Sequence, residues 1–230
     1  EAVVNVGRPS MVGMSELPLE HIHIGPDNAG NDNAAAVILH GRGADEEDLL
    51  PIARSLPDHL HIVSLRAPDR LQGGYTLYEL DLSGGGIHQS QPDATDFDRS
   101  RRLVTESIDA AVDRYGIAPD HIGLLGFSQG AITSLSLLVD SPDRYRWVVA
   151  LHGYLPDSHN DVDPEGIADK PVFIAAGRAD EIIPAARSEA AANRFETLGA
   201  TVEYTASPGG HGIGPAEHEE LVEFVAEQVT

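Results

Sequence analysis

Residues 122–131 read IGLLGFSQGA, an apolar run that leads into a serine with a glycine two positions away on either side. The run has the composition of a buried β-strand, and residues 131–139 have the pattern of a helix. In a sharp strand–turn–helix connection, such glycines allow close backbone approach and the serine hydroxyl projects above the sheet. The G-x-S-x-G motif therefore predicts a nucleophile at Ser128. A turn of small residues that only packs is the alternative, and the order of the elements favours it less.

The rest of the chain alternates between short apolar runs and helical patterns. Such alternation is typical of a mostly parallel sheet that is covered by helices on both faces. We expect a single domain over residues 1–230, with an N-terminal segment, residues 1–24, in which His21–Ile24 alternates like an edge strand. Strands are expected at residues 34–39, 60–65, 122–127, 147–151, 172–176 and 202–204, and helices at residues 45–55, 97–115, 131–139, 184–198 and 215–228.

A serine hydroxyl needs a base to act as a nucleophile, and the base needs an acid to orient it. In sheets that carry this serine turn, the acid and then the histidine follow the serine along the chain. Asp180 lies shortly after the strand at residues 172–176, and His211 lies in a glycine-rich loop after the strand at residues 202–204. Both come at carboxyl ends of strands, where the active sites of open α/β sheets lie. We therefore predict Asp180 and His211 as the partners of Ser128.

Four other residues compete for these two roles. Glu181 is the neighbour of Asp180 and its close rival, whereas Asp169 precedes its strand and so lies at the wrong end. His152 follows a strand but comes before any candidate acid, so we interpret it as part of the pocket wall. His218 stands among glutamates in the last helix, which favours a solvated surface position.

Stabilising the oxyanion of acyl transfer takes two preorganised N–H donors. The backbone N–H of Gln129, the residue after the serine, is the first. The second should come from the loop after an early strand, and we assign it to the backbone N–H of Arg42 in the HGRG sequence of residues 40–43. The side chain of Arg42 either lies at the pocket mouth, where it would attract carboxylate-bearing esters, or forms a surface ion pair with Asp45.

Composition excludes several classes of function. The chain has 230 residues, 41% of them hydrophobic, which is enough for a substantial core. Its 15 basic and 37 acidic residues give a net charge of −22, which argues against binding nucleic acid or anionic lipid. Cysteine is absent, which excludes disulfides and a cysteine nucleophile. No apolar run approaches the roughly 20 residues that span a bilayer, and no secretory signal is evident, so a cytoplasmic location is expected.

The acidic residues are spread along the chain rather than gathered in a tail. Lys170 is the only lysine, against fourteen arginines. This pattern is typical of proteins from salt-accumulating microbes, in which molar salt screens the repulsion between like charges. The alternative is an ordinary acidic enzyme from a GC-rich genome.

Two histidine pairs, His21 with His23 and His59 with His61, have the spacing of ligands on one face of a strand. No third ligand is evident for either pair, so surface or core positions are favoured over a metal site. We predict no metal and no organic cofactor.

Six stretches of the chain together resemble one known family. They are residues 39–49 (LHGRGADEEDL), 66–68 (RAP), 126–130 (GFSQG), 153–156 (GYLP), 177–180 (GRAD) and 210–212 (GHG). In order and spacing they resemble the phospholipase/carboxylesterase family of α/β-hydrolases, which includes acyl-protein thioesterases and bacterial carboxylesterases. The acidic stretch that follows residues 40–41 is more similar to the bacterial carboxylesterases.

The resemblance implies an α/β-hydrolase fold with little or no cap domain and a serine carboxylesterase that acts on short- to medium-chain or aromatic carboxylic esters. It makes Ser128 the nucleophile, Asp180 the orienting acid and His211 the base. The alternatives are acyl-protein thioesterase or lysophospholipase activity, and a hydrolase fold that binds a ligand without catalysis. The implied partner is a small-molecule ester, with no nucleic acid and no membrane insertion, and a homodimer is expected because relatives often form dimers.

The substrate pocket transfers least well from the family. Arg42 stands where many relatives carry a small or apolar residue, and residues 71–93 match the family poorly. The longer segment of residues 69–95 has two glycine clusters and no clear period, which indicates a functional, lid-like loop. We assign the pocket wall to Tyr75, Tyr78, Ile87, His152 and Leu155.

Overall fold

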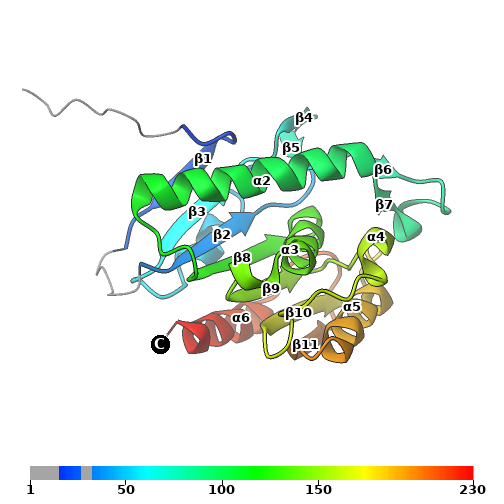
Figure 1. The fold of residues 1–230 in the computed structure, drawn as a ribbon. Helices are drawn as coiled ribbons and strands as arrows, with labels where there is room; N and C mark the ends of the chain where they lie inside the picture. Colours follow the sequence, from blue (N-terminus) through cyan, green and yellow to red (C-terminus); the bar gives the residue numbers. More distant parts are fainter. Residues whose placement is uncertain (1–15, 27–32, 230) are drawn as a thin grey trace, which may run out of the picture.

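The computed structural model describes residues 16–26 and 33–229. A seven-stranded sheet in the order β1-β3-β2-β8-β9-β10-β11 forms its centre (Figure 1). The edge strand β1 pairs antiparallel with β3, and the other pairs in this sheet are parallel. The strands of this sheet are β1 (His21–Ile24), β2 (Ala35–Leu39), β3 (His61–Leu65), β8 (Ile122–Phe127), β9 (Trp147–Leu151), β10 (Pro171–Gly177) and β11 (Thr201–Ser207).

Helices cover both faces of this sheet (Figure 1). Side chains of α2, α3 and α5 join one apolar core, and side chains of α1 and α6 join another on the opposite face. The mostly parallel sheet with helices on both faces confirms the expected fold class. The helices are α1 (Leu50–Ala53), α2 (Ala94–Tyr115), α3 (Gln129–Asp140), α4 (Asp157–Asn160), α5 (Ala185–Thr197) and α6 (Pro215–Gln228), with short 3-10 turns η1 (Ile87–Gln89) and η2 (Pro142–Arg144).

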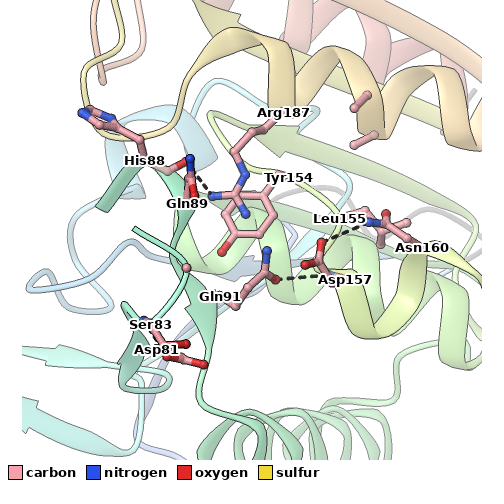
Figure 2. Close-up of a pocket in the computed structure, with 13 residues that line it drawn as sticks. Asp81, Ser83, His88, Gln89, Gln91, Tyr154, Leu155, Asp157, Asn160 and Arg187 are labelled. Carbon is pink, nitrogen blue, oxygen red and sulfur yellow. Dashed lines mark hydrogen bonds between the residues drawn. The ribbon is translucent and has the colours of Figure 1, made fainter. Parts of the chain in front are cut away.

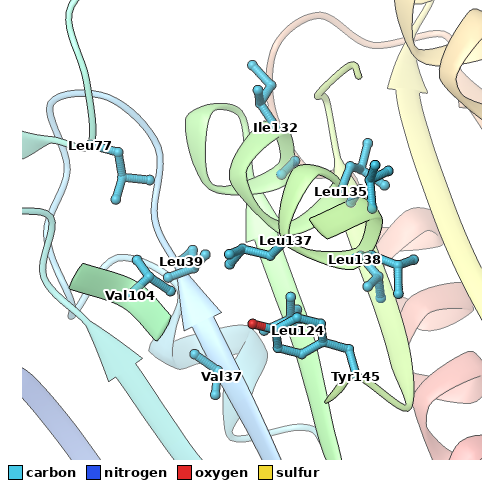
Figure 3. Close-up of a cluster of buried hydrophobic side chains, with 14 of the residues drawn as sticks. Val37, Leu39, Leu77, Val104, Leu124, Ile132, Leu135, Leu137, Leu138 and Tyr145 are labelled. Carbon is cyan, nitrogen blue, oxygen red and sulfur yellow. The ribbon is translucent and has the colours of Figure 1, made fainter. Parts of the chain in front are cut away.

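Alternation along the strands divides their side chains between the two cores. In β2, Val37 and Leu39 belong to the core under α2 and α3, whereas Ile38 belongs to the core under α6. Figure 3 shows Leu137 of α3 close to Leu39 at the carboxyl end of β2. Because both faces of β2, β8, β9 and β10 are buried, these strands are almost entirely apolar, and this explains why the sequence alone identified them.

The predicted helix at residues 45–55 is wrong in its extent, because only Leu50–Ala53 is helical. Pro51 has no N–H to donate to the carbonyl of Glu47, so a helix that began at residue 45 would lose a bond in its interior. Proline is instead tolerated in the first turn, which is where α1 places it.

Residues 69–92 do not form a structureless loop. They fold into a hairpin of β4 (Asp69–Leu71) and β5 (Gly74–Thr76), followed by the antiparallel pair β6 (Leu80–Asp81) and β7 (Gln91–Pro92), with η1 between the last two. In Figure 1, β4 and β5 lie above α2, whereas β6 and β7 lie beyond its right-hand end, toward α4. Across the described ranges, no helix has both the length and the apolar character needed to cross a membrane.

The N-terminal expectation is confirmed where the structure describes it, since His21–Ile24 is the antiparallel edge strand β1. Residues 1–15 of the predicted 1–24 segment lie outside the described residues.

Candidate active site

Ser128 occupies the turn between β8 and α3 with φ 53° and ψ −114°. A positive φ is costly for any residue with a Cβ, so the surrounding packing must hold the turn. A Cβ placed on Gly126 would lie 2.3 Å from the carbonyl carbon of Gly130, and one on Gly130 would lie 2.0 Å from the carbonyl oxygen of Leu39. Only glycine fits at both flanks, and the turn can therefore bring the serine close to the end of β2.

His211 lies in the loop after β11 and reaches Ser128 across the carboxyl edge of the sheet. Its Nε2 is 3.0 Å from Ser128 Oγ, and its Nδ1 is 2.7 Å from Asp180 Oδ2. An ionised carboxylate only accepts hydrogen bonds, so Nδ1 carries the hydrogen and Nε2 is free to accept the serine proton. The structure brings together the three side chains that the chain order singled out.

Asp180 is held by four N–H groups in all, two from the backbone and two from histidine rings. Its Oδ1 accepts from the N–H groups of Ile182 and Ile183 at 2.8 and 2.9 Å, and its Oδ2 faces His211 and His152. Burial by itself raises the pKa of Asp180, but the hydrogen bonds from His211 and the two backbone N–H groups outweigh it, and the pKa is lowered. Asp180 is thus ionised at neutral pH, whereas its rival Glu181 is exposed.

The Gly41–Arg42 peptide passes beside Ser128, since a Cβ on Gly41 would lie 3.4 Å from the serine Cβ. The carbonyl of Gly41 accepts from His40 Nδ1 at 2.7 Å and from the N–H of Ala44 at 3.3 Å. In a trans peptide the next N–H points away from that carbonyl, so these two bonds fix the direction of the Arg42 N–H.

The Gln129 N–H is the first of α3, where helix geometry leaves it without a backbone acceptor. The side chain of Gln129 holds the end of β5 and the residues that follow it. Its Oε1 accepts hydrogen bonds from Thr76 and Leu77, and its Nε2 donates one to the carbonyl of Tyr78. This buried amide ties the start of α3 to the β5–β6 segment.

Arg42 borders the cavity beside Ser128, as the first of the two alternatives expects, but the ion pair with Asp45 is not formed. It pairs with Glu79 at 3.0 Å, not with Asp45, and it donates to Thr76 and to the carbonyl of Tyr78. The charge of Arg42 is therefore already balanced by Glu79 at the rim of the site.

A cavity of about 560 Å³ opens beside Ser128 and His211. Of the predicted wall residues, Tyr78 and Ile87 line it, whereas Tyr75, His152 and Leu155 do not. The ring of Tyr75 packs instead under the guanidinium groups of Arg66 and Arg70. Apolar lining residues that the sequence did not reveal are Leu71, Leu80, Phe127, Ile132, Tyr154, Ile182 and Ile183.

Leu155 lines a second, more polar cavity of about 640 Å³ between the β6–β7 segment and α5, which Figure 2 shows. Tyr154 borders both cavities. Its hydroxyl donates to the carbonyl of Ser90, and the guanidinium of Arg187 lies 3.2 Å from the centre of its ring. Arg187 also donates to the Ser90 carbonyl at 2.9 Å. The Ser90 carbonyl, in the wall between the two cavities, is thus hydrogen-bonded to both Tyr154 and Arg187.

His152 is a correction to the sequence interpretation. It is fully buried behind Asp180 rather than in the pocket wall, and its ring lies between Asp180 and Glu217. Chain order could not place it, because a residue at the end of β9 can point into the cavity or beneath the site.

Among residues 16–26 and 33–229, one group brings three potential ligand atoms within 4.8 Å of one another, namely His152, Asp180 and His211, but these atoms are already hydrogen-bonded to each other. The two Nδ1 atoms face the same Asp180 oxygen at hydrogen-bond distances. Of the histidine pairs considered from sequence, His23 contacts His61 at 3.0 Å and His21 contacts the hydroxyl of Tyr115 at 2.6 Å. His218, expected to be solvated, is half-buried and lies 2.6 Å from Ser55 Oγ.

The sheet order and the serine turn at the carboxyl edge define an α/β-hydrolase. The chain belongs to the phospholipase/carboxylesterase family, whose model matches residues 26–229. It is therefore a hydrolase of the class that acts on esters.

Individual relatives and solved structures agree with this family. MhqD of Bacillus subtilis (strain 168) is 26% identical over 211 residues, which is 92% of this chain and 100% of MhqD. Acyl-protein thioesterase 1 of Aspergillus fumigatus is 32% identical over 153 residues, which is 64% of this chain and 62% of that protein. The crystal structure of the Bacillus cereus carboxylesterase matches with a TM-score of 0.81 and 26% identity, over 91% of this chain and 94% of that one.

Proposed function

We propose that this chain is a serine carboxylesterase that hydrolyses short- to medium-chain or aromatic carboxylic esters through Ser128, His211 and Asp180. The observation that carries the proposal is an unbroken chain of contacts, from Ser128 Oγ to His211 Nε2 at 3.0 Å and from His211 Nδ1 to Asp180 Oδ2 at 2.7 Å. The order of proton donors and acceptors in that chain is the one that nucleophilic catalysis requires.

Acylation begins when Ser128 Oγ attacks the ester carbonyl carbon and passes its proton to His211 Nε2. The negative charge that develops on the carbonyl oxygen is held by the N–H groups of Gln129 and Arg42, and losing one such donor typically costs about 10²–10³ in turnover. The imidazolium of His211 then protonates the leaving alcohol. Asp180 stays ionised throughout and stabilises that imidazolium.

Deacylation reverses the roles. His211, now neutral, takes a proton from a water molecule, and the hydroxide oxygen bonds to the acyl carbon. Collapse of the second oxyanion breaks the bond to Ser128 Oγ, which recovers its proton from His211 as the carboxylic acid leaves.

The cavity beside Ser128 supports a substrate of modest size with an apolar or aromatic portion. Half of its lining residues are leucine, isoleucine, tyrosine or phenylalanine. The hydroxyl of Tyr78 in this wall is buried and has no partner in the described part of the chain. With no exposed surface, Tyr78 contributes the apolar bulk of its ring to this wall.

Ser128→Ala tests the proposal directly. We expect hydrolysis of a short-chain p-nitrophenyl ester to fall by about 10⁴-fold or more, with an unchanged circular-dichroism spectrum. A fluorophosphonate probe should label the unsubstituted protein and not the variant. Turnover retained in Ser128→Ala would refute the assignment, and absence of labelling in the unsubstituted protein would favour a fold that binds a ligand without catalysis.

A second candidate, acyl-protein thioesterase or lysophospholipase activity, is favoured by the relatives named acyl-protein thioesterase 1. The same machinery cleaves oxygen esters and thioesters, so the distinction lies in the leaving group and the acyl chain. A panel of matched oxygen esters and thioesters with increasing acyl length separates the two. A kcat/KM that rises up to long acyl thioesters would favour the thioesterase over the carboxylesterase.

A cytoplasmic location and a homodimer stay predictions.

A further inference from the structure

His152 lies at the end of β9 with no exposed surface and with φ 52°. Its Nδ1 is 3.2 Å from Asp180 Oδ2, the same oxygen that faces His211. Its Nε2 is 3.1 and 3.3 Å from the two carboxylate oxygens of Glu217, a buried residue in the first turn of α6. The contacts therefore continue past the proposed catalytic group, from Asp180 to His152 and on to Glu217.

The protons in this arrangement can be counted from the acceptors. Asp180 is ionised and only accepts, so the Nδ1 of His152 must carry a hydrogen. A proton must also lie between Nε2 and Glu217, because two unprotonated acceptors would repel each other at 3.1–3.3 Å. His152 is then either an imidazolium beside an ionised Glu217 or a neutral ring beside a protonated one.

The groups that surround the His152 ring favour the imidazolium with an ionised Glu217. Burial disfavours the cation, but the hydrogen bonds and charges of Glu217 and Asp180 exceed that effect and raise the pKa of His152 above its ordinary value. A buried cation is tolerated when opposite charges flank it and its donors are satisfied. Here one carboxylate lies against each ring nitrogen.

We propose that His152 is a buried imidazolium held between Asp180 and Glu217, and that this positioning residue makes His211 a weaker base than Asp180 alone would make it. The proposal rests on the proposed function of Ser128, His211 and Asp180. The titratable groups that face His152 are Asp180 after β10, Glu217 on α6 and His211 after β11, whose ring centre is 5.6 Å away. The other ring beside it, Phe127, carries no charge.

The direction of the effect follows from the order of charges. The positive end of the His152–Glu217 pair is nearer to His211 than the negative end, since His152 lies between Asp180 and Glu217. A cation that shares Asp180 Oδ2 opposes a second cation on His211. His211 thus stays unprotonated, and able to accept the serine proton, at a lower pH than it would without the pair.

Glu217→Gln removes the negative end and lets His152 become neutral while it still donates from Nδ1. We expect the acid limb of the kcat/KM–pH profile for a p-nitrophenyl ester to move up by about one pH unit, with the plateau changed only a few-fold. Glu219→Gln is the matched control, because Glu219 is exposed on the same helix and loses the same charge. Equal acid limbs in the two variants, or a plateau lost without a shift, would overturn the proposal.

His152→Asn gives a second, independent variant. Asparagine tolerates a positive φ and places an amide N–H near the position of Nδ1, but it carries no charge. Combined with Glu217→Gln, it should shift the acid limb no further than Glu217→Gln alone. An additive shift would contradict a shared origin.

A measurement on the unsubstituted protein covers the case in which these variants fold poorly. With ¹⁵N-labelled histidine at pH 7.5, an ordinary imidazole is mostly neutral, since its pKa is about 6.5. We expect the imidazole of His152 to be doubly protonated, with its signal assigned by its disappearance in His152→Asn or by its contact with Glu217. A singly protonated His152 would overturn the proposal. This readout needs no turnover, so it separates the inference from the proposed function, which Ser128→Ala tests.

Discussion

Ser128, the proposed nucleophile, has an unfavourable backbone conformation. Its φ of 53° is one that residues with a Cβ seldom adopt, and such positions cost about 1–3 kcal/mol each. The contacts of Gly126 and Gly130 hold the turn in place against this cost. The strained backbone conformation of Ser128 places its hydroxyl at the carboxyl edge of the sheet.

We predict that Ser128→Gly is more stable than Ser128→Ala by about 1 kcal/mol, although neither variant hydrolyses ester. Glycine relieves the strain, whereas alanine keeps it. Urea denaturation of both variants gives the difference in unfolding free energy. Ser136, in the interior of α3, is the control, because there alanine should be the more stable replacement. The same order of stability at both positions would contradict the strain argument.

At the residue level, the sequence predicted which three side chains meet better than it predicted their surroundings. Ser128, Asp180 and His211 follow strands at one edge of the sheet, so the topology brings them together. Glu217 was not identified, although its spacing to Leu221, Phe224 and Val225 places it on the buried face of α6. The helical period carries that signal, but a glutamate among other acidic residues is equally typical of a solvated helix face.

Among the elements, the strands and long helices were the most predictable, because burial on both faces of a sheet leaves continuous apolar runs. The predicted helix at residues 215–228 is α6, and the stripe from Phe97 to Tyr115 lies within α2. The small hairpins of residues 69–92 were not predictable in the same way. Their sequence is polar and rich in glycine and shows neither helical nor strand periodicity. They are held mainly by packing against the rest of the protein.

The edge strand β11 faces α6 across a group of acidic residues. Although Glu203 is an exposed residue, partial desolvation, followed by the charges of Glu227, Glu223 and Glu220, raises its pKa. An acid whose pKa is raised by folding lowers stability once the pH exceeds its unfolded value, and the loss is complete above its folded value. At neutral pH, Glu203 therefore opposes the docking of α6 against the sheet.

Glu203→Gln should accordingly raise the melting temperature at pH 7, and the gain should vanish as the pH falls below the ordinary carboxyl range. Differential scanning calorimetry across that pH range measures the effect. Glu196→Gln makes the same change of charge at an exposed position of α5 and serves as the control. A gain for Glu203→Gln that is independent of pH, or matched by Glu196→Gln, would rule out this origin.

For the whole molecule, the excess of negative charge is the dominant electrostatic feature. The net charge is −22, and several of the arginines already pair with acidic side chains, among them Arg66, Arg99, Arg101, Arg144 and Arg194. The unpaired remainder of the acidic groups repels itself and opposes the compact state. The origin in a salt-accumulating microbe stays a prediction, whereas the repulsion follows from the charge itself.

We predict that the melting temperature rises between low salt and molar KCl. The Debye length falls from about 10 Å at 0.1 M to about 3 Å at 1 M, which screens charges at the spacing of surface side chains. Sucrose, which stabilises proteins without screening charge, serves as the control for a general solute effect. A melting temperature that does not change with KCl would remove the argument.

The order of His211 and α6 along the chain has a consequence for the newborn protein. Synthesis proceeds from the N-terminus, so residues 211 and 217 are made well after Ser128. A nascent chain that has not reached them lacks both the imidazole proposed to activate the serine and the carboxylate proposed to hold His152 as a cation. Under these proposals, the growing polypeptide gains its activity only after α6 has been made.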